Sequence, residues 1–153
     1  LRFLAHNANV CSVGNVRVGQ THLAIALGHH ACLQGASVLF TNTIEAINTL
    51  NAAVEAGGFK TAMKRYLKPA LLILELGYLP IDQRGADLLF QIISQRYECG
   101  SIILTTNRPF KDWPAIFNDD STITSAVLDR LLHHAETVII DADSYRMKDK
   151  IDP

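Results

Sequence analysis

Five short apolar runs, each separated from the next by a helical pattern, constrain the fold more than any other feature of this 153-residue chain. Short apolar runs next to Gly, Pro or Asn are typical of buried strands. Buried strands that alternate with helices are typical of a parallel sheet covered on both faces. We therefore expect an α/β protein with a five-stranded, mostly parallel sheet. The predicted strands are Asn9–Gly14, Ala36–Phe40, Ala70–Leu74, Ser101–Asn107 and Glu136–Asp141.

The segments between these runs have the periodicity and end signals of helices. Apolar residues recur on one face of Thr21–Gly35, and the glycine ends that helix. Asn42 and Thr43 can cap Ile44–Ala56. The sequence shows no internal repeat and no low-complexity segment, so residues 1–153 are interpreted as one domain. The other predicted helices are Phe59–Leu67, Asp82–Gly100 and Ser125–Ala135.

The segment after the first predicted strand has the spacing of a phosphate-binding loop, G-x-x-x-x-G-[K]-[ST], in Gly14, Gly19 and Thr21. In such a loop backbone N–H groups bind phosphate, the lysine reaches the β- and γ-phosphates, and the hydroxyl binds Mg²⁺. Gln20 replaces the lysine, and its neutral hydrogen bond is about half as strong as a charge-assisted one. Arg17 lies inside the loop. The spacing alone is compatible with a nucleotide site, a remnant of one or a chance pair of glycines.

Several longer stretches resemble one family. They are THLAIALG (21–28), LLILELGYLP (71–80), GADLLFQIISQRYE (85–98), GSIILTTNRPF (100–110) with Trp113, and VLDRLLHHAE (127–136) followed by SYR (144–146). Together they resemble the IstB-like helper ATPases of insertion-sequence transposons, which are related to DnaC-type helicase loaders in the AAA+ class. The resemblance covers residues 1 to about 148. It implies an αβα P-loop sandwich whose five-stranded parallel sheet has the order 5-1-4-3-2.

The resemblance also implies a function: ATP is bound and hydrolysed while the protein assembles on DNA and helps a partner transposase engage its target. Family members read like GNxGVGKT in the phosphate loop. Gln20 therefore departs at the lysine, and Arg17 departs at a glycine that adopts positive φ, which a side chain resists. Arg146 resembles the sensor-2 arginine. The nucleotide-contacting residues implied are Gly14, Asn15, Val16, Arg17, Val18, Gly19, Gln20, Thr21, His22 and Arg146.

The acidic motif after the third predicted strand is one residue shorter than the family pattern LLILDELGYLP. Aligned on LGYLP, Glu75 is the catalytic glutamate and the magnesium-binding aspartate is absent. Aligned on LLIL, Glu75 replaces the aspartate and the water-activating glutamate is absent. In either alignment one carboxylate must serve both the metal and the water. Thr21 and Glu75 are the implied Mg²⁺ ligands, and Glu75 is also a candidate catalytic residue.

Two further residues match catalytic positions of the family. Asn107 matches the sensor-1 residue between the γ-phosphate and the attacking water, and Arg130 matches the arginine finger that reaches a neighbouring subunit's nucleotide. Without the resemblance, Asn107 is a turn residue before Pro109. Arg130 is then a surface arginine paired with Asp129 or Glu136.

The net charge of −1 provides no global positive field, so contact with nucleic acid would require a local patch. Lys60–Lys68 is the candidate: a solvated helix face, or a contact with the DNA backbone that depends on salt and not on sequence.

Arg96 is interpreted as a residue that packs at a helix end and complements its dipole. The three cysteines have no metal-site spacing and are expected to be reduced. The chain contains no leader and no apolar run of membrane-spanning length, so a cytoplasmic protein is expected.

Three hypotheses follow. The first is an ATP-binding AAA+ domain that assembles into oligomers on DNA with the transposase of the same element. The second is a degenerate copy in which the fold survives but binding or hydrolysis is lost through Arg17, Gln20 and the shortened acidic motif. The third is an interaction module that contributes Arg130 to active partners. We favour the first for the family function and the second for catalysis, and we expect the family's N-terminal segment to be missing.

Overall fold

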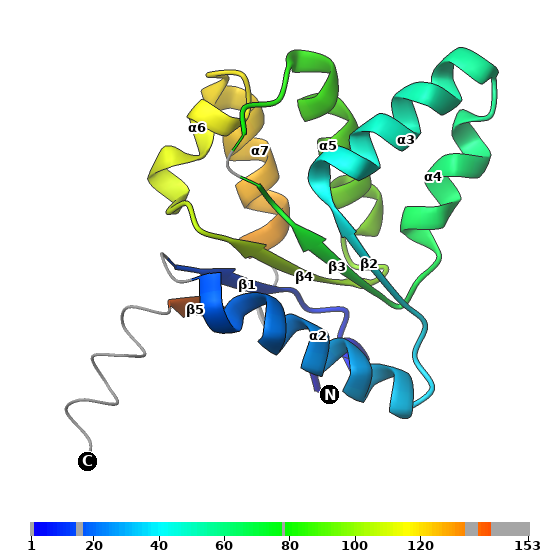
Figure 1. Cartoon of the computed structure of the whole chain (residues 1–153), viewed down its shortest axis with the longest axis vertical. Coiled ribbons are helices and arrows are strands. Elements are labelled where there is room, and N and C mark those ends of the chain that lie inside the picture. The colour runs from blue at the N-terminus through cyan, green and yellow to red at the C-terminus, as the bar shows by residue number, and fades with distance from the viewer. Residues whose placement is uncertain (1, 15–16, 78, 134–137, 142–153) are drawn as a thin grey trace.

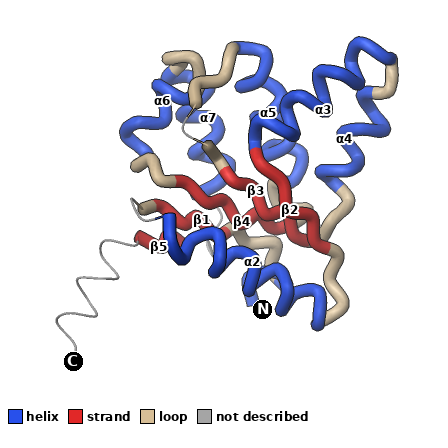
Figure 2. Tube along the Cα trace, in the orientation of Figure 1, coloured by secondary structure: helices blue, strands red, loops and turns tan. Residues whose placement is uncertain are grey.

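The computed structural model describes residues 2–14, 17–77, 79–133 and 138–141, and it forms a parallel sheet with helices on both faces (Figure 1). Figure 2 shows the strands in the centre and the helices around them. The strands are β1 (Val10–Val13), β2 (Val38–Asn42), β3 (Leu71–Glu75), β4 (Ser101–Thr106) and β5 (Val138–Asp141). The helices are α1 (Arg2–Ala5), α2 (Arg17–Leu33), α3 (Thr43–Ala56), α4 (Phe59–Leu67), α5 (Gln83–Arg96), η1 (Phe110–Asp112), α6 (Trp113–Ile116) and α7 (Ser121–Leu132).

All strand pairs are parallel, and their order is β2-β3-β4-β1-β5. Read from the β5 edge, this is the order 5-1-4-3-2. The step from β1 to β2 crosses the sheet in one direction, and the steps from β2 through β3 and β4 to β5 run in the other. Because parallel crossovers are right-handed, α2 lies on one face and α3, α4, α5 and α7 lie on the other, as Figure 1 shows.

The core has two parts, one on each face of the sheet. Along β3, Leu72 and Leu74 belong to the larger apolar cluster beneath α3, α5 and α7. Leu71 and Ile73 belong to the smaller cluster beneath α2. A strand buried on both faces reads as a continuous apolar run. This is why LLIL was recognisable as a strand in the sequence.

Several predicted boundaries were wrong because local hydrogen bonds shift them. The segment predicted as a strand from Ala36 begins only at Val38, because the Ala36 N–H bonds to the Ala31 carbonyl and closes the end of α2, with Gly35 at φ 88°. Helix α7 begins at Ser121, not Ser125. The Asp120 carboxylate caps it by accepting from the N–H groups of Thr122 and Ile123.

The start of α2 is also corrected. The helix was predicted to begin at Thr21 but begins at Arg17. Arg17, which stands where the family has a glycine with positive φ, has a helical backbone instead. A residue with a Cβ avoids the left-handed region, and the early start of the helix satisfies that preference. The short elements α1, η1 and α6 were not predicted at all.

Candidate nucleotide site at the carboxyl edge of the sheet

The carboxyl ends of β1, β3 and β4 lie side by side and bring predicted site residues to one edge. The Gly14 N–H donates to the Thr106 carbonyl at 3.1 Å, which joins the ends of β1 and β4. The Leu76 N–H donates to the Thr105 carbonyl at 2.8 Å, which joins the ends of β3 and β4. In open α/β sheets, ligands bind where adjacent strands lead to opposite faces. That condition is met between β1, which leads to α2, and β4, which leads to α7.

The connection from β1 to α2 consists of residues 14–16 only, because α2 begins at Arg17. Gly14 is buried at the end of β1. Arg17, Val18, Gly19 and Gln20 form the first turn of the helix. N–H groups in the first turn have no partner within a helix, and the helix dipole makes this end positive. The turn therefore presents the backbone donors that anions bind.

Not every residue of the implied nucleotide set can be placed. Asn15, Val16 and Arg146 lie outside the described residues. Thr21 is half-buried in α2, and the neighbouring His22 is exposed. The structure thus brings Gly14 and the start of α2 together with the ends of β3 and β4.

Glu75 is the last residue of β3 and its side chain is exposed. Successive strand residues point to opposite faces, so Glu75 follows Leu71 and Ile73 on the face covered by α2. Leu76 is on the other face, 2% exposed within the larger apolar cluster. The Thr43 hydroxyl donates to the Glu75 carbonyl at 3.1 Å and helps to fix the backbone here.

Asn107 follows buried residues of β4 and is half-exposed at the same edge. The turn that carries it is held by two hydrogen bonds. The Arg108 N–H donates to the Thr106 hydroxyl, and the Trp113 indole donates to the Arg108 carbonyl, both at 3.0 Å. Trp113 is fully buried and packs edge-on against Phe110, with ring centroids 5.1 Å apart. The sequence identifies Trp113 only as part of the family motif and does not predict that its indole anchors this turn.

Arg130 lies at the opposite end of the molecule. It occupies the last turn of α7, where the Leu131 carbonyl accepts a hydrogen bond from Asn9, just before β1. Its guanidinium lies 3.1 Å from the Asp129 carboxylate and 5.4 Å from the centroid of the Tyr97 ring, and its side chain is 42% exposed. The predicted pairing with Asp129 is therefore present, whereas Glu136 lies outside the described residues. From this position Arg130 does not reach the candidate site at the carboxyl ends of β1, β3 and β4 in the same chain.

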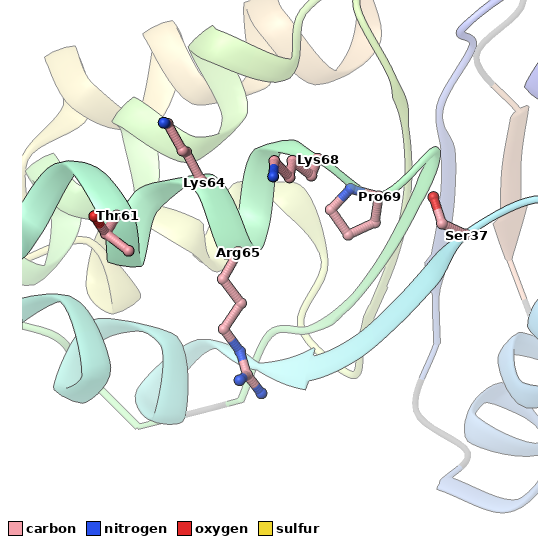
Figure 3. Close-up of a pocket in the computed structure, with 6 residues that line it drawn as sticks. All are labelled: Ser37, Thr61, Lys64, Arg65, Lys68 and Pro69. Atoms are coloured by element: carbon pink, nitrogen blue, oxygen red, sulfur yellow. The ribbon is translucent and has the colours of Figure 1, made fainter.

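A shallow basic depression of about 580 Å³ lies at the amino edge of the sheet (Figure 3). Lys64, Arg65 and Lys68 from the end of α4 line it with Thr61, and Ser37 and Pro69 lie where β2 and β3 begin. The three basic side chains are exposed. Within the described part of the chain, no carboxylate lies at ion-pair distance from any of them.

Arg96 differs from the expectation of a simple helix-end residue. It is 1% exposed, and burial lowers the pKa of its guanidinium from 12.5 to about 10, although the neighbouring Cys99 acts in the opposite direction. Its partners are five backbone carbonyls. The sequence carries no local signal for this role, because the carbonyls come from distant segments.

Other expectations concern metals, cysteines and membranes. Over residues 2–14, 17–77, 79–133 and 138–141, no three His, Cys, Asp or Glu side chains are grouped to hold a metal ion. All three cysteines are free; Cys11 is buried in β1, and burial raises the pKa of its thiol from 9.0 to about 12. Among the described helices, none has the length and hydrophobicity required to cross a membrane.

A family model described as IstB-like ATP binding protein matches residues 1–152. The chain belongs to this family. It is 43% identical over 150 residues to the protein named for ATP binding in insertion sequence IS232 of Bacillus thuringiensis, covering 97% of this chain and 60% of the relative. It is 42% identical over 151 residues to the IS21 counterpart of Pseudomonas aeruginosa, covering 98% and 57%. The chain thus spans about 60% of the length of the curated relatives it matches.

Solved structures confirm the class of fold. The DnaC helicase loader is similar with a TM-score of 0.70 and 22% identity, over 91% of this chain and 84% of that one. DnaA of Aquifex aeolicus bound to AMPPCP is similar with a TM-score of 0.73 and 18% identity, over 92% of this chain and 42% of that one. The IstB-like chain therefore has the same parallel α/β fold as these proteins.

Proposed function

We propose that this chain is the nucleotide-binding part of an insertion-sequence helper protein that assists a transposase, with hydrolysis impaired in this copy. The observation that carries the proposal is the meeting of Gly14, Glu75 and Asn107 at adjacent strand ends, beside the first turn of α2. Membership of an ATP-binding family supports ATP as the ligand.

The residues present fit a bound ATP in part. The first turn of α2 supplies N–H donors and a positive dipole end for phosphate oxygens. Thr21 supplies a hydroxyl and Glu75 a carboxylate, which are oxygen ligands of the kind Mg²⁺ prefers. ATP with Mg²⁺ would bring a phosphoryl group that water can attack. Gln20 lacks the charge that holds this group in the family, so affinity is expected to be reduced but not abolished.

Impaired hydrolysis is supported by the position of Leu76. Counting along β3 from LLIL, Glu75 occupies the place of the aspartate in LLILDELGYLP, and Leu76 occupies the place of the glutamate. Leu76 is buried on the face away from α2, so no carboxylate follows Glu75 to activate water. We therefore favour the alignment on LLIL, with Glu75 serving the metal.

The partners proposed are the transposase of the same element, DNA and further copies of the chain. The names of the relatives place them in insertion sequences, and a DnaA structure similar in fold contains single-stranded DNA. The basic depression on α4 supports a contact with the DNA backbone. Arg130 is exposed and lies far from the candidate nucleotide site of its own chain. Assembly would therefore allow it to act on the nucleotide of a neighbouring subunit.

A second candidate function is an interaction module that does not hydrolyse ATP but completes the site of an active homologue. The exposure of Arg130 and its location at the opposite edge favour this reading. In phosphoryl-transfer enzymes, an arginine supplied in trans raises the rate by roughly 10³–10⁵. Stimulation of an intact homologue's ATPase by this chain, lost in Arg130→Ala, would distinguish this candidate from a purely degenerate copy.

The test is ATP binding by titration calorimetry, with and without Mg²⁺, for the unaltered chain and for Gln20→Lys. A charge-assisted hydrogen bond is stronger than a neutral one by about 1–1.5 kcal/mol, so Gln20→Lys is expected to bind ATP roughly 5–15-fold more tightly. Gln34→Lys adds the same charge beyond the other end of α2 and is the matched control, with no expected gain. Absence of binding by both the unaltered chain and Gln20→Lys would refute the nucleotide site. ATP turnover by the unaltered chain would refute impaired hydrolysis.

A further inference from the structure

Arg96, the last residue of α5, is a buried cation whose partners are all backbone carbonyls. Its Nη1 donates to the carbonyls of Tyr66, Leu67 and Pro69 at 3.0, 3.3 and 2.8 Å, and its Nη2 donates to those of Ala70 and Ser101 at 3.3 and 2.7 Å. No carboxylate from the described residues pairs with it. One guanidinium therefore joins the end of α4, the entry to β3 and the entry to β4.

These bonds fix the backbone from which the basic depression projects. Four of the five carbonyls in residues 66–70 bond to Arg96, and the exception is that of Lys68 itself. Lys68 is thus held on both sides, while its own N–H bonds to the Lys64 carbonyl at 2.9 Å. Lys64 and Arg65 directly precede the held segment and line the depression. Their side chains leave α4 in opposite directions (Figure 3).

The surrounding sequence accommodates the guanidinium closely. A Cβ at Gly100 would lie 2.7 Å from Nη2 of Arg96 and 3.1 Å from its Cζ, so a side chain there would displace the group. Arg96 also remains charged at neutral pH, because its pKa stays near 10. Its charge adds to that of Lys64, Arg65 and Lys68, and no described acid neutralises any of them.

We propose that Arg96 is a positioning residue for nucleic-acid binding: it fixes the end of α4 so that Lys64, Arg65 and Lys68 contact successive backbone phosphates together. This inference rests on the proposed DNA partner and adds the residues that make the contact and the group that orders them. Ordering the backbone before binding removes part of the entropic cost of association. Basic side chains on a loose segment would bind phosphates one at a time, with fewer counterions released in each complex.

The experiment measures binding of the full chain to a fluorescein-labelled random-sequence DNA duplex at salt concentrations from 50 to 200 mM. Each phosphate contact contributes about −0.9 to the slope of log K against log salt. Lys64→Gln and Lys68→Gln are each expected to reduce the steepness by about one contact. Lys111→Gln, which removes an exposed lysine beyond β4 at the other edge, is the matched control and is expected to leave it unchanged.

Arg96→Lys tests the positioning role. Lysine has three donors where arginine has five, so several carbonyls lose their partner. We expect the steepness to fall by at least one contact at temperatures where the variant is fully folded, with ATP binding unchanged. Gly100→Ala displaces the guanidinium without altering any charge, and the same fall is expected. A merely structural role would lower the melting temperature and leave the slope of the folded protein as it was.

The outcomes separate this inference from the proposed function. If the unaltered chain binds DNA and both Arg96→Lys and Gly100→Ala keep its slope, the positioning role is overturned and the DNA partner stands. If DNA binds but Lys64→Gln and Lys68→Gln change nothing, the surface is wrong and the inference fails. If the unaltered chain does not bind DNA at 50 mM salt, the DNA partner itself is refuted.

Discussion

Cys11 makes the stability of this fold depend on pH in a direction and amount that can be worked out. The Cys11 thiol is buried in the larger apolar cluster on one face of the sheet, and its pKa rises from 9.0 to about 12 because burial disfavours the thiolate. In the unfolded chain the thiol ionises above pH 9, whereas in the folded chain it stays protonated. The stabilisation is therefore complete below pH 9 and is lost as pH rises towards 12.

The magnitude follows from the two pKa values. Between pH 7.5 and pH 10, ionisation of this thiol in the unfolded chain lowers the free energy of unfolding by about 1.4 kcal/mol. Arg96 acts with the opposite sign, because its lowered pKa of about 10 makes the folded state release a proton first. A comparison of two proteins that both contain Arg96 cancels that contribution.

The assay is urea unfolding at pH 7.5 and pH 10, monitored by the fluorescence of Trp113, the only tryptophan and a fully buried one. We expect the free energy of unfolding to fall by about 1.4 kcal/mol more for the unaltered chain than for Cys11→Ala. The alanine variant starts from a lower stability, so the change between the two pH values is the quantity compared. An equal fall in both proteins would refute the reasoning.

Two further expectations concern the nucleotide edge. Trp113→Phe leaves the Arg108 carbonyl without its partner and a gap in a filled cluster, so unfolding measured by circular dichroism should cost about 2–4 kcal/mol less; unchanged stability would contradict the anchoring role. Leu76→Glu should destabilise the chain by about 3 kcal/mol or more and produce no ATPase activity, because the new carboxylate enters the apolar cluster opposite Glu75; turnover in a coupled assay would show that the face is assigned wrongly.

Much of the architecture could be predicted because the apolar runs are continuous and separate. All five predicted strands exist. The signal is strongest for β3, because a strand covered on both faces is a nearly continuous apolar run. Their order came from the family resemblance, because periodicity does not specify which strands are neighbours. Boundaries were wrong where a single hydrogen bond decides them, as at Asp120 and Ala36. Short elements such as η1 and α6 escaped prediction because they are too short to have a period.

The candidate site was predictable in its parts and not in its geometry. Gly14 was identified from its loop spacing, and Glu75 and Asn107 from the family resemblance. Parallel strands bring the strand ends that carry them to one edge. The sequence alone does not distinguish the two alignments of the acidic motif, on LGYLP or on LLIL. They become distinct on the strand, because a deletion of one residue sends every later side chain to the opposite face. Arg96 could not be predicted, since its five carbonyls come from segments that meet only in the folded chain.

The position of Leu76 also connects the proposed impairment of hydrolysis with the stability of the fold. A glutamate at that place would have to be kept in water at the edge of the sheet, whereas a leucine extends the alternation of Leu72 and Leu74 into the larger cluster. Burying a leucine stabilises a fold by about 1.5–3 kcal/mol. In the proposed alignment, one deletion thus both removes the water-activating carboxylate and brings Leu76 into contact with the core. Residues of active sites commonly lower the stability of a fold in favour of function. At Leu76 we infer the opposite, because the leucine stabilises the core where the family has a functional carboxylate. A variant that regains the carboxylate and its activity should therefore be less stable to unfolding by about 1.5–3 kcal/mol.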